Sequence, residues 1–347
     1  MAGKAKSDLY KAAGVDIDFA ISLLDKVKGK FAQSRRPEML SPIGGFGGLF
    51  QIDLSKYKNP VMVSSIDGVG TKLMIAMMME KYDTVGHDIV NHCIDDIAVQ
   101  GAEPVYFMDY IGIGKLRSPL YEQVLNGIAD ACIAANCAVL GGETAEMPGM
   151  YGNDFDLVGV ITGIVERDKI ITGEKIRPGH VAIGLGSSGL HTNGFSLARD
   201  IVFNKCGYTV NTYLDELGET VGEALLKPHT CYWSAIKRAM NEGVSLDGIA
   251  HITGGGLYDN VHRILPANVD VHFDVKDMPI PPIFKVLVEK GNVDKVEAYR
   301  VFNMGIGMVW FVPAAEADAA IKICRECGFV ANKVGEITEG SKTVHVK

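Results

Sequence analysis

PVMVSSIDGVGTKLMIAMMM, residues 60–79, predicts a strand, a glycine turn and a helix in immediate succession. The β-branched run from Val61 to Ile66 is typical of a buried strand, and an apolar run of helical length follows the turn at 67–72. Unpaired backbone N–H groups at the start of such a helix favour an anion such as phosphate. Asp67 would repel a phosphate unless a divalent cation lay between them, so Asp67 is a candidate Mg²⁺ ligand. An ordinary Asp-Gly turn is the alternative, because the string is neither the Walker pattern nor G-x-G-x-x-G.

The composition is that of a large globular protein. The chain has 347 residues, of which 47% are hydrophobic and 22% charged, so it can bury a sizeable core and favours two domains over one. Its formal net charge of −8, without a basic run or a basic amphipathic helix, gives no electrostatic footprint for nucleic acid or a membrane surface. Any anionic ligand must therefore be held by local groups.

The N-terminal stretch MAGKAKSDLYKAAGVDID has no apolar signal core, and no run reaches the roughly 18 apolar residues of a membrane span, so we expect a cytoplasmic protein. The seven cysteines are scattered and odd in number, which predicts reduced thiols. Cys324 and Cys327 form the only C-x-x-C. Because no second Cys or His pair lies near them in sequence, packing on a helix is favoured over a zinc site.

Two features precede the opening strand. Residues 16–30 predict a helix that stops near Gly29, with Lys28 as a solvated cation at its C-terminal end. The segment SPIGGFGGLF, 41–50, is too rich in glycine for a regular element and is expected to be mobile. Such a loop either joins two elements or closes over a ligand, and the sequence leaves both open.

Residues 84–100 predict a helix with two unlike faces. One face carries an apolar stripe. The other carries side chains with oxygen or nitrogen ligand atoms: Asp88, Asn91, His92, Asp95 and Asp96. A solvated face normally mixes lysines among its acids, yet no Lys or Arg occurs between Lys81 and Lys115. A metal or nucleotide role for Asp96 and a solvated acidic face remain the two alternatives.

The first half then alternates strands and helices. We expect a strand at 105–113, a helix at 119–136, a short strand ending at Gly141-Gly142, and a strand at 156–165. The strand that ends at the glycines delivers Glu143, which with Glu146 makes a second carboxylate source. Residues 166–180 mix charge, Gly and Pro without periodicity, which predicts a domain boundary and hence domains of residues 1–170 and 171–347.

The second half repeats the strand, glycine turn and helix design. His191 lies in a Gly/Ser/Asn turn after the strand VAIGLG, where a functional role is favoured over core packing. His251 lies inside a short strand before Gly254, Gly255 and Gly256, which permit close backbone approach to a ligand. Residues 299–312 predict one long strand, followed by a terminal helix and strand. Each half is therefore expected to be an α/β or α+β layer structure.

Taken together, these strings resemble the ordered motif set of the phosphoribosylformylglycinamidine cyclo-ligases, also called aminoimidazole ribonucleotide synthetases. The resemblance covers Tyr10 to about Val312 and rests on eight strings: YKAAGVDID, GGFGGLF, DGVGTK, DDIAVQGAEP, GGETAEMPGMY, GSSGLHTNG, AHITGGG and YRVFNMGIGM. Eight strings in one order are highly specific. The pattern from Asp96 to Pro104 alone is shared with selenophosphate synthetase, thiamine-phosphate kinase and other members of a wider superfamily.

The resemblance implies an ATP- and Mg²⁺-dependent ring closure of formylglycinamidine ribonucleotide to aminoimidazole ribonucleotide, with release of ADP and phosphate. Phosphorylation of the formyl oxygen makes the carbon electrophilic and supplies a leaving group. An internal nitrogen then closes the ring, helped by proximity within one bound molecule. It also implies two α/β domains of similar size, a homodimer to which the N-terminal strands contribute, and a C-terminal α/β sandwich that completes the active site.

The resemblance further implies roles for individual residues. Catalytic positions are Lys28 near the phosphates, Asp67, His191 and His251, the two histidines having unassigned roles. Metal positions are Asp67, Asp96 and Glu143. Nucleotide- or phosphate-binding positions are Gly44, Gly45, Gly47, Gly48, Lys72, Asp96, Glu143, Gly254, Gly255 and Gly256.

One position departs from the family pattern. Where Val-Asn-Asp is expected, the chain has Ile94-Asp95-Asp96, which adds a carboxylate beside Asp96 and either tightens metal binding or weakens ATP binding. A sister kinase with another acceptor and a catalytically inactive nucleotide-binding protein are the alternative functions. The selenophosphate and hydrogenase-maturation branches are disfavoured, because the first cysteine is Cys93 and the chain does not end in cysteine.

Overall fold

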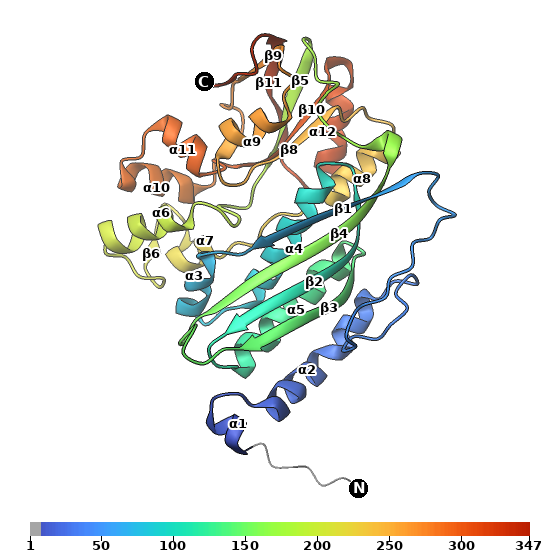
Figure 1. Ribbon diagram of the computed structural model, residues 1–347. Coiled ribbons are helices and arrows are strands. Elements are labelled where there is room, and N and C mark those ends of the chain that lie inside the picture. Colours follow the sequence, from blue (N-terminus) through green and yellow to red (C-terminus); the bar gives the residue numbers. More distant parts are fainter. Residues whose placement is uncertain (1–7) are drawn as a thin grey trace.

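The computed structural model describes residues 8–347, which form two α/β halves, each built on a mixed sheet (Figure 1). Residues 1–7, on which part of the expectation about a signal core falls, lie outside the described residues. Within 8–347 no helix combines the length and the apolar character that a membrane crossing requires. The predicted two-domain α/β organisation is confirmed.

The sheet of the first half has the strand order β1-β4-β2-β3, in which only β2 and β3 run parallel. Its strands are β1 (Pro60–Gly68), β2 (Glu103–Ile113), β3 (Ala138–Glu146) and β4 (Phe155–Glu166). Its helices are α1 (Asp8–Ala12), α2 (Ile17–Phe31), α3 (Lys72–Met79), α4 (Asp83–Ala98) and α5 (Ser118–Ala134), with a 3₁₀ turn at Ala32–Ser34. The predicted strand, turn and helix at 60–79 are β1 and α3.

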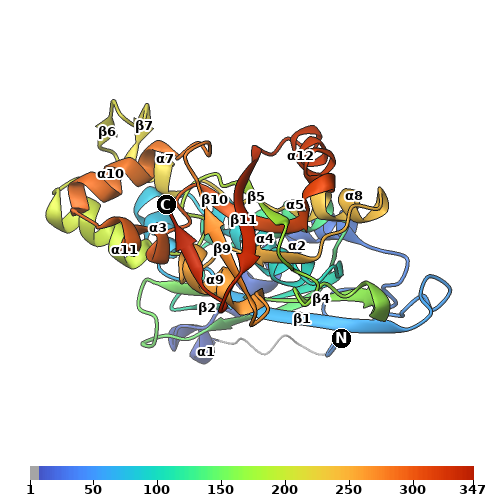
Figure 2. The ribbon, with the colours of Figure 1, turned by 90° about the horizontal axis from the view of Figure 1, so that it is seen from above.

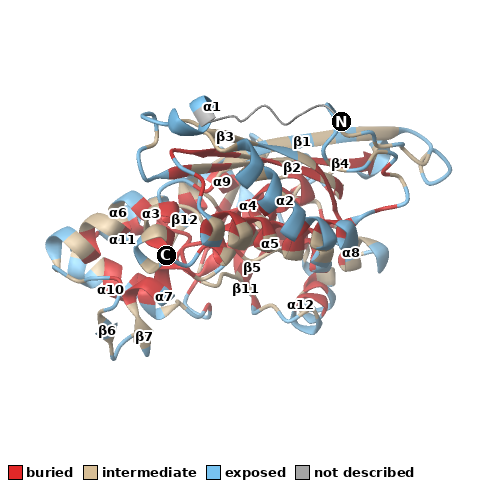
Figure 3. Ribbon diagram, turned by 90° about the horizontal axis from the view of Figure 1, so that it is seen from below, coloured by how far each residue is buried: buried red, intermediate tan, exposed pale blue. Residues whose placement is uncertain are grey.

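The helices α2, α4 and α5 cover one face of this sheet and leave the other open (Figures 2 and 3). Along β1 the side chains of Met62, Ser64 and Ile66 alternate onto the open face, where Met62 and Ile66 are 52% and 66% exposed. Toward β3, a short bridge between Met39 and Phe50 covers part of the same face. Two large apolar side chains on an uncovered sheet are unusual for an isolated soluble domain.

The sheet of the second half has the order β12-β9-β11-β5-β10-β8, with β12 parallel to β9 and the other pairs antiparallel. Its strands are β5 (His180–Gly186), β8 (Gly248–His251), β9 (Val269–Phe273), β10 (Ile306–Pro313), β11 (Ala331–Glu339) and β12 (Val344–Val346), beside the hairpin β6 (Tyr213–Leu214) and β7 (Glu219–Thr220). Its helices are α6 (Phe195–Arg199), α7 (Val221–Leu225), α8 (Trp233–Asn241), α9 (Gly256–Ile264), α10 (Pro282–Gly291), α11 (Lys295–Val301) and α12 (Ala317–Glu326), with a π-helical segment at Asp200–Lys205 and 3₁₀ turns at Arg167–Lys169 and Ala314–Glu316. The central strands β5 and β10 are buried along nearly their whole length, as expected for strands covered on both faces.

Helix α4 lies between the two halves and fixes where the functional side chains meet. Its apolar stripe packs on the first sheet, and the opposite side faces the second half, so Asp88, His92 and Asp95 are buried. The largest buried apolar cluster includes residues of both halves. The alternative of a solvated acidic face on this helix is therefore wrong for these three side chains.

Three expected boundaries differ from the structure. Helix α2 continues through Gly29 to Phe31, because Leu23, Val27 and Phe31 continue its buried stripe. Strand β3 continues through Gly141 and Gly142, which pair with Met108 and Asp109 of β2 after a register shift at Leu140, so Glu143 lies within the strand.

The third difference concerns residues 299–312, which are not one strand. Tyr299 belongs to helix α11. Asp294 caps this helix by accepting a hydrogen bond from the N–H of Glu297. Met304 and Gly305 then take left-handed conformations before β10 begins at Ile306. The domain division at 170/171 stays a prediction; it falls in the connection between β4 and β5.

Candidate active site

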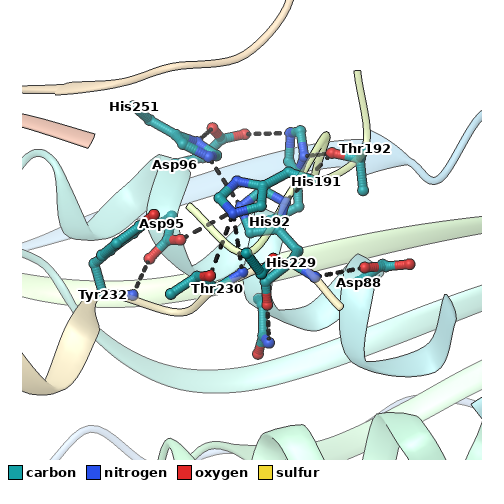
Figure 4. Close-up of polar contacts among 12 residues, drawn as sticks. Asp88, His92, Asp95, Asp96, His191, Thr192, His229, Thr230, Tyr232 and His251 are labelled. Carbon is teal, nitrogen blue, oxygen red and sulfur yellow. Dashed lines mark hydrogen bonds and ion pairs between the residues drawn. The ribbon is translucent and has the colours of Figure 1, made fainter. Parts of the chain in front are cut away.

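Four histidines from four separate segments converge where α4 meets the second half (Figure 4). His92 projects from α4, His191 lies in the turn between β5 and α6, and His229 lies between α7 and α8. His251 ends β8. Each ring centroid lies 4.1–5.2 Å from at least one other histidine ring centroid. Asp67, at the end of β1, and Asp95 and Asp96 of α4 surround this histidine cluster.

The carboxylates of Asp67 and Asp96 both approach the same nitrogen. His92 Nε2 lies 2.7 Å from Asp67 Oδ2 and 3.8 Å from Asp96 Oδ2. Asp67 Oδ1 accepts a hydrogen bond from the N–H of Gly68, and Asp96 Oδ2 accepts one from Ser65. Asp96 Oδ1 also contacts His251 Nδ1 at 2.9 Å. Both carboxylates remain partly exposed, so an incoming ligand can reach them.

The environment separates the proton affinities of His92 and His251. Burial favours the neutral form of both rings. At His92, the hydrogen bond and charge of Asp67 and the charge of Asp96 outweigh burial and raise the pKa. At His251, burial outweighs the hydrogen bond to Asp96, and a charged His92 nearby also lowers the pKa. The site thus favours a cationic His92 beside a neutral His251, a division typical of acid–base sites.

A chain of polar contacts connects the two rings. His92 Nδ1 lies 2.6 Å from Thr192 Oγ1, which lies 3.4 Å from His229 Nδ1, and His229 Nε2 lies 3.1 Å from His251 Nε2. One assignment of protons satisfies every contact: His92 donates to the threonine, the threonine to His229, His229 to His251, and His251 to Asp96. Burial lowers the pKa of His229 well below its usual value, in agreement with its neutral form.

The Asp67–His92 contact predicts a pH-dependent contribution to stability. The pKa of Asp67 is lowered, since contacts with His92 outweigh its burial. Ionised Asp67 therefore stabilises the folded state above about pH 4, and this stabilisation is lost at lower pH. Because the pKa of His92 is raised, cationic His92 stabilises the folded state below about pH 6.5. This stabilisation is lost as the pH rises through the pKa that His92 has in the folded state. We expect the melting temperature of Asp67→Asn to fall furthest below wild type between about pH 4 and 6.5, and the gap to narrow by pH 8. Thermal scans across this range check it, and a gap that widens toward pH 8 would contradict it.

His191 packs against His229 in the buried part of the cluster. It is 1% exposed, stacks on His229 with ring centroids 4.1 Å apart, and contacts Thr230 through Nε2. Burial lowers its pKa well below the usual value. Its backbone has a left-handed φ of 61°, and its carbonyl oxygen accepts a hydrogen bond from Lys72 Nζ. Of the two histidines predicted to be catalytic, only His251 lies against the partly exposed carboxylates, and His191 packs against His229.

Lys72 does not lie where a nucleotide could contact it, which corrects the expectation drawn from DGVGTK. The side chain is fully buried, and Nζ contacts Asp88 at 2.8–2.9 Å and the carbonyl oxygens of His191 and Lys227 at 2.9 and 2.7 Å. An ammonium group has three N–H donors, and these acceptors use all of them. Lys72 is therefore a buried cation that joins α3 to α4 and to the second half.

The glycine-rich loop lines a different cavity, of about 280 Å³, at the β3 edge of the first sheet. Gly44, Gly45, Gly47 and Gly48 of the loop and Glu143 of β3 line it together with α2 and α5. Gly48 approaches β3 so closely that an added Cβ would lie 2.2 Å from Leu140. Asp109 also lines this cavity, and burial raises its pKa to about 7, helped by the charge of Glu143.

The structure does not bring Glu143 to the other expected metal ligands. Asp67 lies on β1 and Glu143 on β3, and β4 and β2 run between them, a separation of about 14 Å at the usual strand spacing. One ion bound at 2.0–2.6 Å cannot contact both side chains within this chain. Lys28 also stands apart: it is half-exposed on α2 and paired with Asp25 at 2.5 Å.

The turn at Gly254 to Gly256 leads from His251 into α9. Gly255 and Gly256 have φ of 98° and 58°, and a Cβ at Gly256 would lie 1.9 Å from the carbonyl oxygen of Tyr299, so the close approach requires glycine. The predicted phosphate role of this turn, at the start of α9, stays a prediction.

His229 was not predicted from the sequence, and His92 was predicted only as one of several side chains with ligand atoms on its helix. His92 had a signal, because it shares a helical face with Asp96 four residues later. His229 lies in the string KPHTCYW, which carries no pattern that points to chemistry. Cys324 lies buried in α12 and Cys327 just after it, in agreement with packing rather than metal binding.

Comparisons with known proteins agree with this arrangement. The family model described as AIR synthase related protein, N-terminal domain, matches residues 52–165, and the corresponding C-terminal domain model matches residues 177–347. Solved structures with the same fold include a thiamine-monophosphate kinase from Stenotrophomonas maltophilia (TM-score 0.68, 19% identity, covering 94% of this chain and 96% of that one). A hydrogenase maturation protein HypE in complex with ATP also matches (TM-score 0.66, 15% identity, 94% and 90%).

Curated relatives are far more similar in sequence. A phosphoribosylformylglycinamidine cyclo-ligase of Alkaliphilus oremlandii is 46% identical over 336 residues, which cover 96% of this chain and 98% of the relative. The enzyme of the same name from Trichlorobacter lovleyi is 48% identical over 334 residues, with coverage of 96% and 95%. Together with the two domain matches, this similarity along nearly the whole length shows that the chain belongs to the phosphoribosylformylglycinamidine cyclo-ligase family.

Proposed function

We propose that this chain converts formylglycinamidine ribonucleotide and ATP into aminoimidazole ribonucleotide, ADP and phosphate, a ring closure of purine biosynthesis. The observation that carries the proposal is the convergence of Asp67, Asp96, His92 and His251 at one partly exposed place between the halves. Phosphoryl transfer requires oxygen ligands for a metal and cationic groups near the phosphates. Ring closure additionally requires a group that can move protons at neutral pH, which a neutral histidine can do.

The donor set fits a Mg²⁺–nucleotide complex. Asp67 and Asp96 are hard oxygen ligands, and their carboxylates retain exposed surface beside the glycine turn that opens α3. When bound, the complex would supply the transferable phosphoryl group and charge neutralisation. Gly70 has a φ of 71° in this turn, which lets the backbone approach a ligand closely. His92, favoured as a cation, adds positive charge next to the two carboxylates.

His251 is the group we assign to proton transfer. Asp96 accepts from Nδ1, which fixes the tautomer and leaves the Nε2 lone pair as the acceptor of the His229 N–H, so His251 can take up a proton through His229. The same contact stabilises the cation that forms when Nε2 is protonated. The N–H groups at the start of α9 would hold a phosphate of the substrate beside this ring.

Product analysis tests the function directly. The purified chain with Mg²⁺ and ATP should form ADP and aminoimidazole ribonucleotide in equal amounts only when formylglycinamidine ribonucleotide is present. Formation of ADP without ring closure would retain the nucleotide site and reject the substrate, in favour of a kinase with another acceptor. Absence of any turnover by folded protein would support a nucleotide-binding protein without activity.

Asp67→Asn tests the assignment of Mg²⁺ to this place. We expect turnover to fall by about 10- to 100-fold even at saturating Mg²⁺, because the amide lacks the charge that a metal ligand contributes. Steady-state kinetics over a range of Mg²⁺ concentrations measure this, with the exposed Asp215→Asn as a control that removes the same charge elsewhere. Near-normal turnover at saturating Mg²⁺ would remove Asp67 from the metal assignment.

We also propose a homodimer formed through the open face of the first sheet. Met62 and Ile66 on this face are large, apolar and exposed, and two such faces can pack about 10 Å apart as in a β-sandwich. Ile66→Lys should raise the dimer dissociation constant by at least about a hundredfold, because it would bury an unpaired charge. Sedimentation measures this, with Val296→Lys on α11 as the matched control. A wild-type monomer at micromolar concentration would exclude the dimer.

A further inference from the structure

The hydrogen bonds assigned to the histidine cluster do not include the buried carboxylate of Asp95, which lies beside it. Asp95 is fully buried, and its Oδ2 has no hydrogen-bond partner among the described residues. Oδ1 is satisfied by the N–H of Tyr232 at 2.9 Å. Oδ2 points to His229, whose Nε2 lies 3.5 Å away, and His229 Nε2 in turn lies 3.1 Å from His251 Nε2 (Figure 4). A buried carboxylate oxygen without a partner is costly unless it meets a proton or a cation.

We propose that Asp95, His229 and His251 form a binding site for one tetrahedral transition-metal ion, with Zn²⁺ as the best match. One atom from each side chain lies within 4.8 Å of the others. Zinc binds imidazole nitrogen and carboxylate oxygen at about 2.0–2.2 Å, which places neighbouring ligand atoms of a tetrahedron about 3.3 Å apart. The measured separations of 3.1 and 3.5 Å lie on either side of this value.

The atoms around the three ligands support the same conclusion. Metal-binding histidines usually donate their second ring N–H to a carboxylate or another acceptor, which turns the free nitrogen toward the metal. His251 Nδ1 contacts Asp96 Oδ1 at 2.9 Å, and His229 Nδ1 contacts Thr192 Oγ1 at 3.4 Å. The N–H of Tyr232 holds Asp95 in place. With the metal bound, His229 would carry its proton on Nδ1 and donate to Thr192, the reverse of the metal-free assignment, and each ligand would then be oriented by a partner that does not bind the metal.

The ligand set favours a transition metal over magnesium and supplies three of the four ligands of a tetrahedral site. Two imidazole nitrogens and one carboxylate oxygen suit Zn²⁺ or Co²⁺, whereas Mg²⁺ prefers oxygen ligands such as Asp67. Three protein ligands leave one position of the tetrahedron for water or a substrate oxygen. His251 is 7% exposed and lies beside the partly exposed Asp96, which provides the approach for the ion. The departure from the expected Asn at position 95 supplies the carboxylate.

A second His/Asp group serves as an internal comparison. Asp270, His272 and His345 also have ligand atoms within 4.8 Å of one another, but both histidines are exposed. Asp270 Oδ1 already accepts two backbone N–H groups, and the two rings stack with centroids 4.5 Å apart. Removing His345 should therefore leave the buried site intact and separate the two sources of metal binding.

The test is metal binding by the untagged full-length chain after treatment with a chelator. Calorimetric titration with Zn²⁺ should show one tight equivalent, and Co²⁺ should give the visible absorption of a tetrahedral complex. Asp95→Asn should weaken the tight equivalent at least about tenfold and abolish the tetrahedral spectrum. The asparagine keeps an Oδ1 acceptor for the N–H of Tyr232, so this variant should fold. His229→Gln should show the same loss, and His345→Gln should bind like wild type.

Three results would overturn the site: no tight equivalent in wild type, equal affinity in wild type and Asp95→Asn, or loss of the tight equivalent in His345→Gln. None of these readouts depends on turnover, so the metal site and the proposed ring closure can fail separately. Where both hold, a bound ion would occupy Nε2 of His251 and withdraw it from proton transfer. Zinc would then act on the enzyme as an inhibitor, removable by a chelator.

Discussion

Asp96→Asn is expected to lower kcat by about 10²- to 10⁴-fold, the range attributed to a positioned acid–base group. Asp96 accepts from His251 Nδ1, and its second oxygen accepts from Ser65. An asparagine can turn its NH₂ toward Nδ1, which would favour the wrong tautomer and leave Nε2 protonated. It would also remove a negative charge that stabilises the cationic form of His92.

Steady-state kinetics of ring closure measure this effect, and the pH profile separates it from a loss of folding. The activity of the variant should persist to a lower pH than that of wild type, because loss of the Asp96 carboxylate destabilises the His251 cation and lowers the pKa of this ring. Asp274→Asn, an exposed carboxylate paired with Lys276, is the matched control and should retain wild-type turnover. A decrease below tenfold in Asp96→Asn would show that the histidine acts without this carboxylate.

Lys72→Met is expected to lower the free energy of unfolding by about 3–5 kcal/mol, because it removes one partner of a fully buried ion pair and strands the other. Asp88 would keep the N–H of His229 as a donor but lose its cation. Burial already raises the pKa of Asp88 in the presence of Lys72. The deficit of the variant should therefore grow as the pH rises above about 4, since the folded state must then hold an unpaired carboxylate.

Denaturant unfolding at several pH values measures the deficit. Lys72→Met/Asp88→Asn should recover part of the lost stability, because it removes the stranded charge, but the carbonyl oxygens of His191 and Lys227 would still lack their donor. Lys276→Met, which breaks an exposed pair, should leave the unfolding midpoint unchanged. Equal stability of Lys72→Met and wild type would show that the buried pair contributes nothing net.

The alternation of strands and helices could be predicted from local patterns in the sequence. Hydrophobic periodicity and glycine turns are local properties, so β1, α3 and α4 could be read from short windows. The boundaries that failed depended on distant partners. Helix α2 runs past Gly29 because Phe31 finds a buried position, and β3 passes through two glycines because β2 lies beside it. The two-domain organisation and the ordered motifs were likewise readable without a structure.

Which of the candidate residues meet depends on how the two halves pack together. Asp67, Asp96 and His251 come together because α4 is held between the two halves, while strand order separates Glu143 from them. Lys72 and Asp95 are charged residues whose sequence context resembles that of ligands, but both are buried. Lys72 is a structural cation, and Asp95 faces His229. His229 gave no signal at all. A side chain's environment depends on residues far away in the chain, and no local pattern encodes it.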